Sequence, residues 1–331
     1  MPKILITGAA GFIGQLLAKR LLNDESYTVT LTDINEPPIP KKVTYPSHAT
    51  SIKADLCNDA SLHSLIPASN PPDAIYVFHG IMSSGSEANL DLGLTVNLDA
   101  TYALLNHLRK LHAQDPTRPL IRIIYASSLA VYGGPLPSVI SESTRATPEG
   151  SYGSQKLIIE TLINDFTRRG LILGFNLRFP TISVRAGKPT QAASSFLSGM
   201  IREPLAGIEC VIPLKDRGFK SWLCSPKTLC ENLVRALSLA PDSVPAHDRV
   251  VNVPGRGFTI QQMMDALAEV GGKEKLALLK EETDVDMERM LRSWGAEFDN
   301  TLGLKLGLVR DGDFVEFVRD YVALVESETS G

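Results

Sequence analysis

Hydrophobic positions in the first 180 residues alternate between short apolar runs and longer segments with helical spacing. Six short runs predict strands: 2–7, 27–33, 50–54, 74–79, 120–127 and 171–179. Apolar residues three and four positions apart predict helices in the segments 12–22, 60–66, 87–112 and 151–168. Because parallel strands need crossover connections, this alternation predicts an α/β fold with a doubly wound parallel sheet.

The pattern changes after residue 180. Separated helices are predicted at 192–205, 226–239, 260–269, 285–293 and 312–325. Short strands are predicted among them at 209–214 and 249–253. We therefore expect two domains: residues 1–180 form the sheet, and residues 181–331 form a smaller C-terminal lobe that interleaves with it.

A glycine-rich turn joins the first predicted strand to the first predicted helix. Gly8 permits a tight turn, Gly11 lets the backbone approach a pyrophosphate, and Gly14 lets helix and strand pack closely. Asp33 ends the second predicted strand, where a carboxylate binds ribose hydroxyls and repels a 2′-phosphate. This context predicts a Rossmann-type sheet that binds NAD rather than NADP. Asp55, after the third strand, fits either an adenine contact or a helix cap.

The segment 151–168 places Tyr152 and Lys156 four residues apart, on one face near the start of a helix. A free tyrosine has a pKa of about 10, so it needs a nearby positive charge to act as a base. Lys156 can supply that charge, and Ser128, at the end of the fifth strand, can orient a substrate hydroxyl. Taken alone, this pentad also fits a surface tyrosine and a solvated lysine.

Together these features resemble the extended short-chain dehydrogenase/reductases, also called the NAD-dependent epimerase/dehydratase family. The landmarks are 7–14, Asp55-Leu56, His79, Asn97, 127–133, and Tyr152 with Lys156. The resemblance implies that Ser128, Tyr152 and Lys156 are catalytic. It implies that the cofactor is bound by these residues: Gly8, Gly11, Phe12, Ile13, Gly14, Asp33, Asp55, Leu56, Gly80, Ile81, Asn97, Tyr152, Lys156, Phe179 and Pro180.

One stretch departs from the family pattern. Many members continue the fourth strand as His-Leu-Ala-Ala, whereas this chain reads His79-Gly80-Ile81-Met82. The backbone role of Gly80 and Ile81 is expected to survive this change. We expect His79 to be a packed histidine, because Tyr152 already fills the role of the base.

The substrate is suggested by residues after the sixth strand. The stretch 177–196, with 202–207 and 91–93, resembles the D-erythronate dehydrogenase branch, which implies oxidation of a small sugar acid at C2. Arginine binds carboxylates through two parallel hydrogen bonds, so Arg185 is the candidate partner of the substrate carboxylate. A structural ion pair with an acidic residue of the protein fits Arg185 equally well. Substrate hydroxyls could meet Ser83, Ser128 and Ser194.

Two other functions stay open at this point. A nucleotide-sugar epimerase or dehydratase would keep NAD bound and recycle the hydride. A sensor that binds NAD without catalysis would share the fold, because fold alone does not establish activity. Complete retention of Ser128, Tyr152 and Lys156 favours an enzyme over a sensor.

Composition and charge limit the partners and the cellular location that we expect for this protein. The 33 basic and 37 acidic residues are scattered and give a net charge of −4, so we expect no nucleic-acid partner. No secretory signal pattern and no apolar run of about 18 residues occurs, so we expect a cytoplasmic protein without a membrane span. The four cysteines fit no paired metal motif, so no metal is expected. The resemblance implies a homodimer formed through the helices at 87–112 and 151–168.

Overall fold

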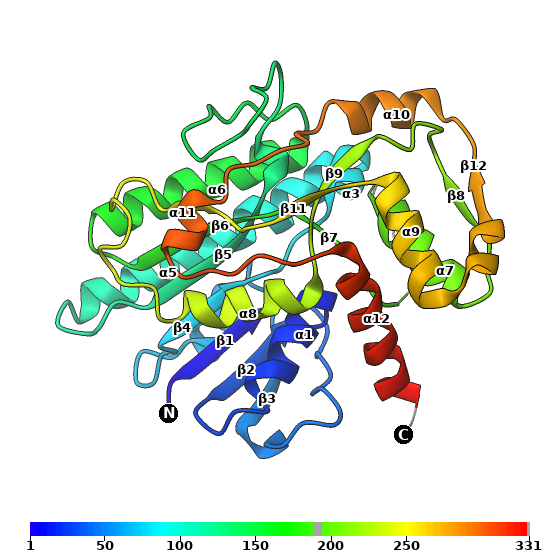
Figure 1. Ribbon diagram of the computed structural model, residues 1–331. Helices are drawn as coiled ribbons and strands as arrows, with labels where there is room; N and C mark the ends of the chain where they lie inside the picture. The colour runs from blue at the N-terminus through cyan, green and yellow to red at the C-terminus, as the bar shows by residue number, and fades with distance from the viewer. Residues whose placement is uncertain (188–193, 330–331) are drawn as a thin grey trace. The chain divides into compact units, whose positions relative to one another are not determined.

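The computed structural model describes residues 1–187 and 194–329, and the chain forms two compact units (Figure 1). The sheet unit consists of Met1–Val131, Ala146–Phe179 and Cys230–Val251. The second unit consists of Tyr132–Arg145, Pro180–Leu229 and Asn252–Gly331. Each unit is therefore assembled from segments that are distant in the sequence.

The sheet unit is built on one large sheet. Within the described residues it has seven strands in the order β10-β6-β5-β4-β1-β2-β3. Their bounds are β1 (Lys3–Thr7), β2 (Thr28–Asp33), β3 (Ala49–Lys53), β4 (Ala74–Val77), β5 (Arg122–Ser128), β6 (Leu173–Phe179) and β10 (Val250–Asn252). The ladders that join β3, β2, β1, β4, β5 and β6 are all parallel. This strand order confirms the predicted doubly wound fold.

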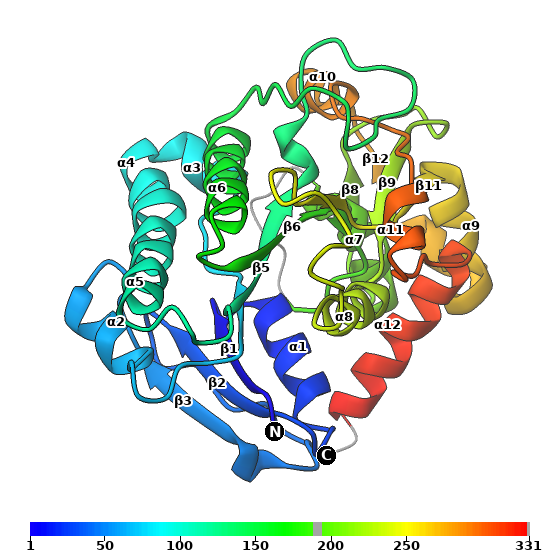
Figure 2. The same ribbon diagram turned by 90° about the vertical axis from the view of Figure 1, so that its left-hand side faces the viewer.

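Helices cover both faces of this sheet. Figure 2 shows α2 (Asp59–Leu65), α5 (Ala100–Gln114) and α6 (Ser151–Arg168) on one side, with α1 (Phe12–Leu21) on the other. Because both faces are covered, the central strands are apolar in their middle positions, and all four residues of β4 are buried. The core under α5 and α6 includes Leu104, Tyr125 and Ile163.

The prediction of a single long helix at 87–112 is wrong. The chain forms α3 (Ser83–Ala88), α4 (Leu90–Gly93) and a π-helical segment at Leu94–Asp99 before α5 begins. Asn89 interrupts the helix with φ −143° and ψ 92°, and its side chain accepts a hydrogen bond from the Leu92 amide. Hydrophobic spacing continues across this break, so periodicity alone did not reveal it.

The second unit combines small sheets with helices. Its described strands form a sheet in the order β11-β9-β7 and a pair β12-β8: β7 (Thr181–Ile182), β8 (Cys210–Ile212), β9 (Lys220–Cys224), β11 (Arg256–Thr259) and β12 (Leu279–Glu281). Its helices include α7 (Ser195–Leu205), α9 (Ile260–Gly271), α10 (Val285–Arg292), α11 (Thr301–Lys305) and α12 (Phe314–Thr329). Residues 192–193 of the predicted helix at 192–205 lie outside the described residues.

α8 (Pro226–Ala236) begins in the second unit and ends in the sheet unit. Inside the sheet unit, the Tyr76 hydroxyl on β4 donates to the Leu233 carbonyl on α8 at 2.8 Å.

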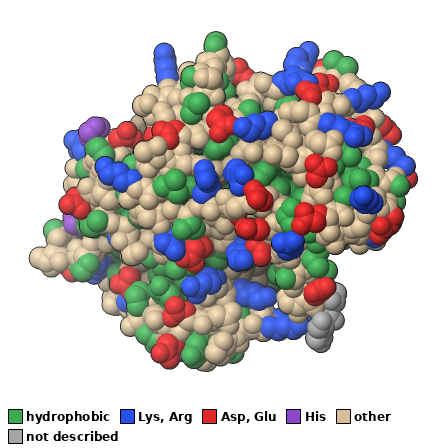
Figure 3. All heavy atoms as spheres, in the orientation of Figure 1, with side chains coloured by type: hydrophobic (Ala, Val, Ile, Leu, Met, Phe, Trp, Pro, Cys, Tyr) green, Lys and Arg blue, Asp and Glu red, His purple; other side chains and the backbone are tan. Residues whose placement is uncertain are grey.

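No helix among residues 1–187 and 194–329 is long and apolar enough to cross a membrane. On the face in Figure 3, acidic and basic side chains are interspersed.

The turn between β1 and α1 is packed too tightly for side chains at two of its glycines. Gly8 has φ +66°, and a Cβ there would lie 2.5 Å from the His79 amide nitrogen. A Cβ on Gly14 would lie 2.7 Å from the Gly8 carbonyl oxygen and from the Ala9 Cα. The glycines therefore set the distance between α1 and the end of β1, as the sequence predicted from their spacing.

Gly14→Ala is expected to lower the free energy of unfolding by about 1–3 kcal/mol, because the clashing atoms are rigid backbone. Denaturant unfolding followed by circular dichroism measures this loss. Gly11→Ala is the matched control, since its Cβ would meet only the Gly8 oxygen at 3.2 Å. Its loss should stay below about 1 kcal/mol. Equal losses in the two variants would contradict the packing argument.

Candidate active site

The three predicted catalytic side chains lie together in the sheet unit. Ser128 is the last residue of β5, and Tyr152 and Lys156 lie on the first turns of α6. The Ser128 side chain hydrogen-bonds the Tyr152 phenol. α6 approaches β5 closely because Gly153 has no side chain: a Cβ there would lie 2.1 Å from the Ala130 carbonyl oxygen. The sequence thus places a phenol and a hydroxyl at the carboxyl end of the sheet, where ligands bind in this fold.

Lys156 is almost completely buried, with 4% of its surface exposed. Its Nζ donates to the Ala126 carbonyl at 2.7 Å and lies 4.7 Å from the centre of the Tyr125 ring. The same Nζ lies 5.5 Å from the centre of the Tyr152 ring. Burial lowers the pKa of Lys156 to about 8, and the charge of Glu160 opposes that fall. A solvated lysine, the alternative reading of the pentad, does not describe this side chain.

Tyr152 has the opposite shift. Burial raises the pKa of its phenol to about 12, against the hydrogen bond from Ser128, which lowers it. Burial and the Ser128 bond together therefore leave the phenol protonated at neutral pH. A positive charge close to the phenol would favour the phenolate, and NAD⁺ carries one on its nicotinamide ring.

His79 follows β4 and is held between two threonines. Its Nδ1 lies 2.8 Å from the Thr7 hydroxyl, and its Nε2 lies 3.0 Å from the Thr101 hydroxyl. Burial, followed by the charge of Lys156, lowers the pKa of His79 to about 3. The imidazole is therefore neutral and packed, which agrees with the role expected for it.

Asn97 fixes the loop that contains Gly80 and Ile81. Its Oδ1 accepts from the Ile81 amide at 2.8 Å, and its Nδ2 donates to the Ile81 carbonyl at 3.1 Å. Nδ2 also donates to Gln155 Oε1 on α6 at 2.6 Å. Asn97 lies in the π-helical segment, a type of distortion that is frequent at functional sites. One buried amide thus connects this loop to the helix that carries Tyr152.

A second contact holds the start of α6. The Glu87 carboxylate on α3 accepts a hydrogen bond from the Ser151 amide, in the first turn of the helix. Ser83 lies at the other end of α3, four residues before Glu87. Neither Glu87 nor Gln155 was identified from the sequence, because their partners are distant along the chain.

The dinucleotide loop fits a pyrophosphate. α1 starts at Phe12 and Ile13 without a side-chain cap, so its first amides are available to phosphate oxygens. Asp33 Oδ2 accepts from the Ala10 amide at 3.0 Å, and Oδ1 accepts from the Ile34 amide at 2.7 Å. These bonds hold a carboxylate beside the glycine turn, where the sequence analysis expects the ribose contact.

The remaining cofactor candidates are placed as follows. Asp55 is exposed and accepts from the Cys57 amide at 2.9 Å, while Asn58 caps α2, so the proposed helix-cap role of Asp55 is filled by Asn58. Leu56 is buried beside Asp55. Phe179 ends β6 in the sheet unit, with its ring centre 6.4 Å from that of Phe78, and Pro180 begins a segment of the second unit.

Two predicted substrate residues belong to the second unit. Ser194 immediately precedes α7, and its side chain forms no cap on that helix. The Arg185 amide donates to Ser198 on α7 at 3.1 Å. Burial, and then the charge of Arg202, lowers the pKa of the Arg185 guanidinium. Within the described residues no carboxylate pairs with Arg185, whereas Arg202 pairs with Glu203. The predicted structural ion pair of Arg185 is therefore not found there.

The described residues contain no group of three His, Cys, Asp or Glu side chains that could hold a metal ion.

The described residues also contain a buried ion pair close to Lys156, between Glu160 on α6 and Arg178 on β6. Glu160 was not among the predicted site residues, although its position four residues after Lys156 can be read in the sequence.

Comparison with known proteins identifies the family. The model of the NAD dependent epimerase/dehydratase family matches residues 4–219. D-erythronate dehydrogenase from Haemophilus influenzae is 37% identical over 97% of this chain and 98% of that protein. D-erythronate dehydrogenase from Cupriavidus necator is 38% identical over 96% of this chain and 97% of that protein.

A solved structure agrees with these matches. The crystal structure described as a nucleoside-diphosphate-sugar epimerase from Agrobacterium tumefaciens is 33% identical, with a TM-score of 0.90. The match covers 97% of this chain and 94% of that one. With the family match and the placement of Ser128, Tyr152 and Lys156, these relatives lead to one conclusion: the chain belongs to the NAD dependent epimerase/dehydratase family.

Proposed function

We propose that this protein is an NAD-dependent dehydrogenase that oxidises the C2 hydroxyl of D-erythronate, or of a closely related small sugar acid, to the 2-keto acid. The observation that carries the proposal is the group of Tyr152, Ser128 and the buried Lys156 at the carboxyl end of the sheet. Two D-erythronate dehydrogenases that match nearly the full chain support the substrate class.

The reaction divides between one proton and one hydride. Tyr152, as phenolate, takes the proton of the substrate hydroxyl while the C2–H bond breaks. Bound NAD⁺ supplies the hydride acceptor, so the products are the 2-keto acid, NADH and a proton. Ser128 donates to the reacting oxygen as its carbonyl forms. Asp33 favours NAD over NADP, because its carboxylate repels a 2′-phosphate.

Lys156 contributes charge within a dry environment. An ammonium excluded from water acts on its neighbours more strongly than a solvated one. Its bond to the Ala126 carbonyl fixes Nζ on the side of α6 that faces β5. In this position the ammonium stabilises the Tyr152 phenolate and is available to the nicotinamide ribose.

Arg185 is the proposed partner of the substrate carboxylate. Its guanidinium is partly desolvated next to another arginine, and within the described residues it has no acidic partner. A planar guanidinium binds a carboxylate through two parallel hydrogen bonds, so a small acid would satisfy this charge. Ser83 and Ser194 are the proposed partners of the other hydroxyls.

An epimerase or dehydratase remains the second candidate, since the structural relative from Agrobacterium tumefaciens is described as an epimerase. Such an enzyme returns the hydride to its substrate and yields no net NADH. Incubation of the protein with NAD⁺ and a panel of short aldonates and uronates separates the two. Accumulating NADH absorbance supports the dehydrogenase, and its absence for every acid overturns it.

Tyr152→Phe is expected to lower kcat by about 10²–10⁴-fold, because general acid–base catalysis contributes that much. Steady-state NADH formation measures the loss, and calorimetry should find NAD binding retained. Tyr45→Phe, which changes a tyrosine stacked on His48, is the matched control and should keep wild-type turnover. Undiminished turnover of Tyr152→Phe would show that another group is the base, or that the chain is not an enzyme of this class.

Arg185→Met is expected to raise KM for the sugar acid by about 10–100-fold, because a charge-assisted hydrogen bond to the carboxylate is lost. The KM for NAD⁺ should stay within about twofold. Arg185→Lys should recover part of the loss, since it keeps the charge but not the planar fork. Arg289→Met, which removes an exposed arginine of α10, is the control. An unchanged KM in Arg185→Met would remove this residue from the substrate site.

We also propose that the protein forms a homodimer through α4, the π-helical segment and α6. A groove of about 360 Å³ in the sheet unit has both apolar and polar lining, and its apolar side chains include Leu90, Leu94 and Ile158. Tyr102, eight residues after Leu94, adds an exposed ring. Exposed apolar patches of this kind mark interaction sites.

Ile158→Glu is expected to shift the protein from dimer to monomer in analytical ultracentrifugation, because the carboxylate would be buried without a partner. Leu304→Glu, at an exposed apolar position of α11, is the control and should leave the oligomer intact. A wild-type protein that sediments only as a 35.9 kDa monomer would contradict the dimer.

A further inference from the structure

Three ionisable side chains follow one another along the buried face of α6. Tyr152, Lys156 and Glu160 are four residues apart, so they lie one above the other on the same side of the helix. Lys156 is 4% exposed and Glu160 is 1% exposed. The face that the sheet covers therefore carries a phenol, an ammonium and a carboxylate in sequence, instead of the apolar residues usual for a core.

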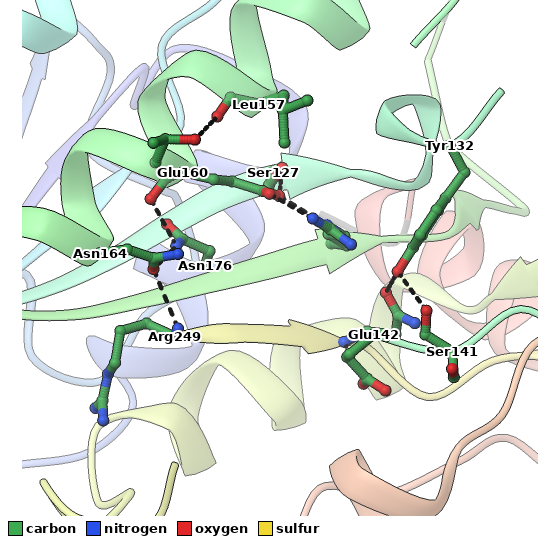
Figure 4. Close-up of polar contacts among 12 residues, drawn as sticks. Ser127, Tyr132, Ser141, Glu142, Leu157, Glu160, Asn164, Asn176 and Arg249 are labelled. Carbon is green, nitrogen blue, oxygen red and sulfur yellow. Dashed lines mark hydrogen bonds and ion pairs between the residues drawn. The ribbon is translucent and has the colours of Figure 1, made fainter. Parts of the chain in front are cut away.

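Glu160 is held as a carboxylate by donors from two strands. Arg178 on β6 binds it with two bonds, Nε to Oε1 at 2.9 Å and Nη2 to Oε2 at 2.6 Å. Arg178 is itself 4% exposed. Ser127, on the neighbouring strand β5, also donates to Glu160 Oε1, as Figure 4 shows. A buried carboxylate with this many donors is fixed in place.

A contribution to folding stability does not by itself account for the buried ion pair between Glu160 and Arg178. Taking two charges out of water costs about as much as their attraction returns, and apolar residues of similar volume often serve as well. The position of the ion pair suggests an electrostatic role, since Glu160 lies one helical turn after Lys156 on α6. Ser127, which binds Glu160, directly precedes Ser128 in β5.

Other elements that pack around Lys156 bring no negative charge at neutral pH. β5 contributes the Tyr125 ring, whose pKa is raised well above its usual value by burial. The segment after β4 contributes the neutral imidazole of His79. Tyr152, on α6 itself, is the group that Lys156 is to activate. Among the described residues, Glu160 is thus the carboxylate that acts on Lys156.

We infer that Glu160, fixed by Arg178 and Ser127, is a positioning residue that keeps Lys156 charged in its dry site and so sets the pH range over which Tyr152 works. The inference rests on the proposed roles of Tyr152 and Lys156. Without Glu160, burial alone would act on the ammonium, which already has a lowered pKa of about 8. Lys156 would then lose its charge within the neutral range.

The sign of the expected change follows from the charge removed. A negative charge favours the protonated form of a nearby ammonium, and Glu160 acts on Lys156, so loss of the Glu160 charge lowers the pKa of Lys156. The alkaline limb of kcat/KM, which reports loss of the ammonium charge, therefore moves to lower pH. A role in packing alone would lower the plateau and leave this limb in place.

The test is the pH profile of kcat/KM for NADH formation in Glu160→Gln and in Glu160→Asp. In Glu160→Gln we expect the alkaline limb to move down by about one pH unit or more. Glu160→Asp, which keeps the charge, should return this limb toward wild type. Asp165→Asn is the matched control, because this exposed carboxylate on α6 pairs with Arg168 and Arg169 at the surface. Its limbs should coincide with those of wild type.

Glu160→Gln leaves Arg178 buried without its partner, so a second variant protects the test from a folding failure. Glu160→Gln/Arg178→Gln replaces the ion pair by two amides, and its alkaline limb should move in the same direction by a smaller amount. An alkaline limb that stays at the wild-type pH in every folded variant overturns the inference. Wild-type protein that forms no NADH overturns the proposed function instead, so the two failures are distinguishable.

Discussion

The site depends on how closely α6 approaches the end of β5. Gly153 makes this possible, since any side chain there would overlap the Ala130 carbonyl. The close approach brings Tyr152 to Ser128 and buries Lys156 against the backbone of β5. Moving the helix outward by one carbon atom would admit water and weaken each of these electrostatic contacts. A single missing Cβ therefore determines the chemistry available at this edge of the sheet.

Burial shifts the pKa values of Lys156 and Tyr152 in directions that oppose catalysis, and neighbouring residues counteract these shifts. A desolvated ammonium tends to lose its proton, and a desolvated phenol tends to keep it, which is the reverse of what a base catalyst needs. Glu160 opposes the first tendency and the Ser128 hydrogen bond opposes the second. Asn97 adds rigidity, because it ties the Ile81 backbone to Gln155 on the same helix. The group thus combines charge compensation with fixed geometry.

Much of this arrangement could be predicted from local patterns. The glycine spacing predicted the turn after β1, and the bounds predicted for the helix 151–168 agree with those of α6. Patterns failed where a single polar residue changes the backbone: Asn89 breaks the helix predicted at 87–112. They also failed for partners that meet only in space, such as Glu160 with Arg178. The roles of the site residues stay predictions.

We propose that a buried ammonium activates a neighbouring phenol for oxidation of a sugar acid by NAD⁺. Lys156→Met keeps the length and burial of the side chain but removes its charge, so it tests that claim most directly. Turnover of D-erythronate with saturating NAD⁺ should fall by about 100-fold or more, since activation of the base is lost. Turnover within a few-fold of wild type in a folded Lys156→Met protein would contradict the account.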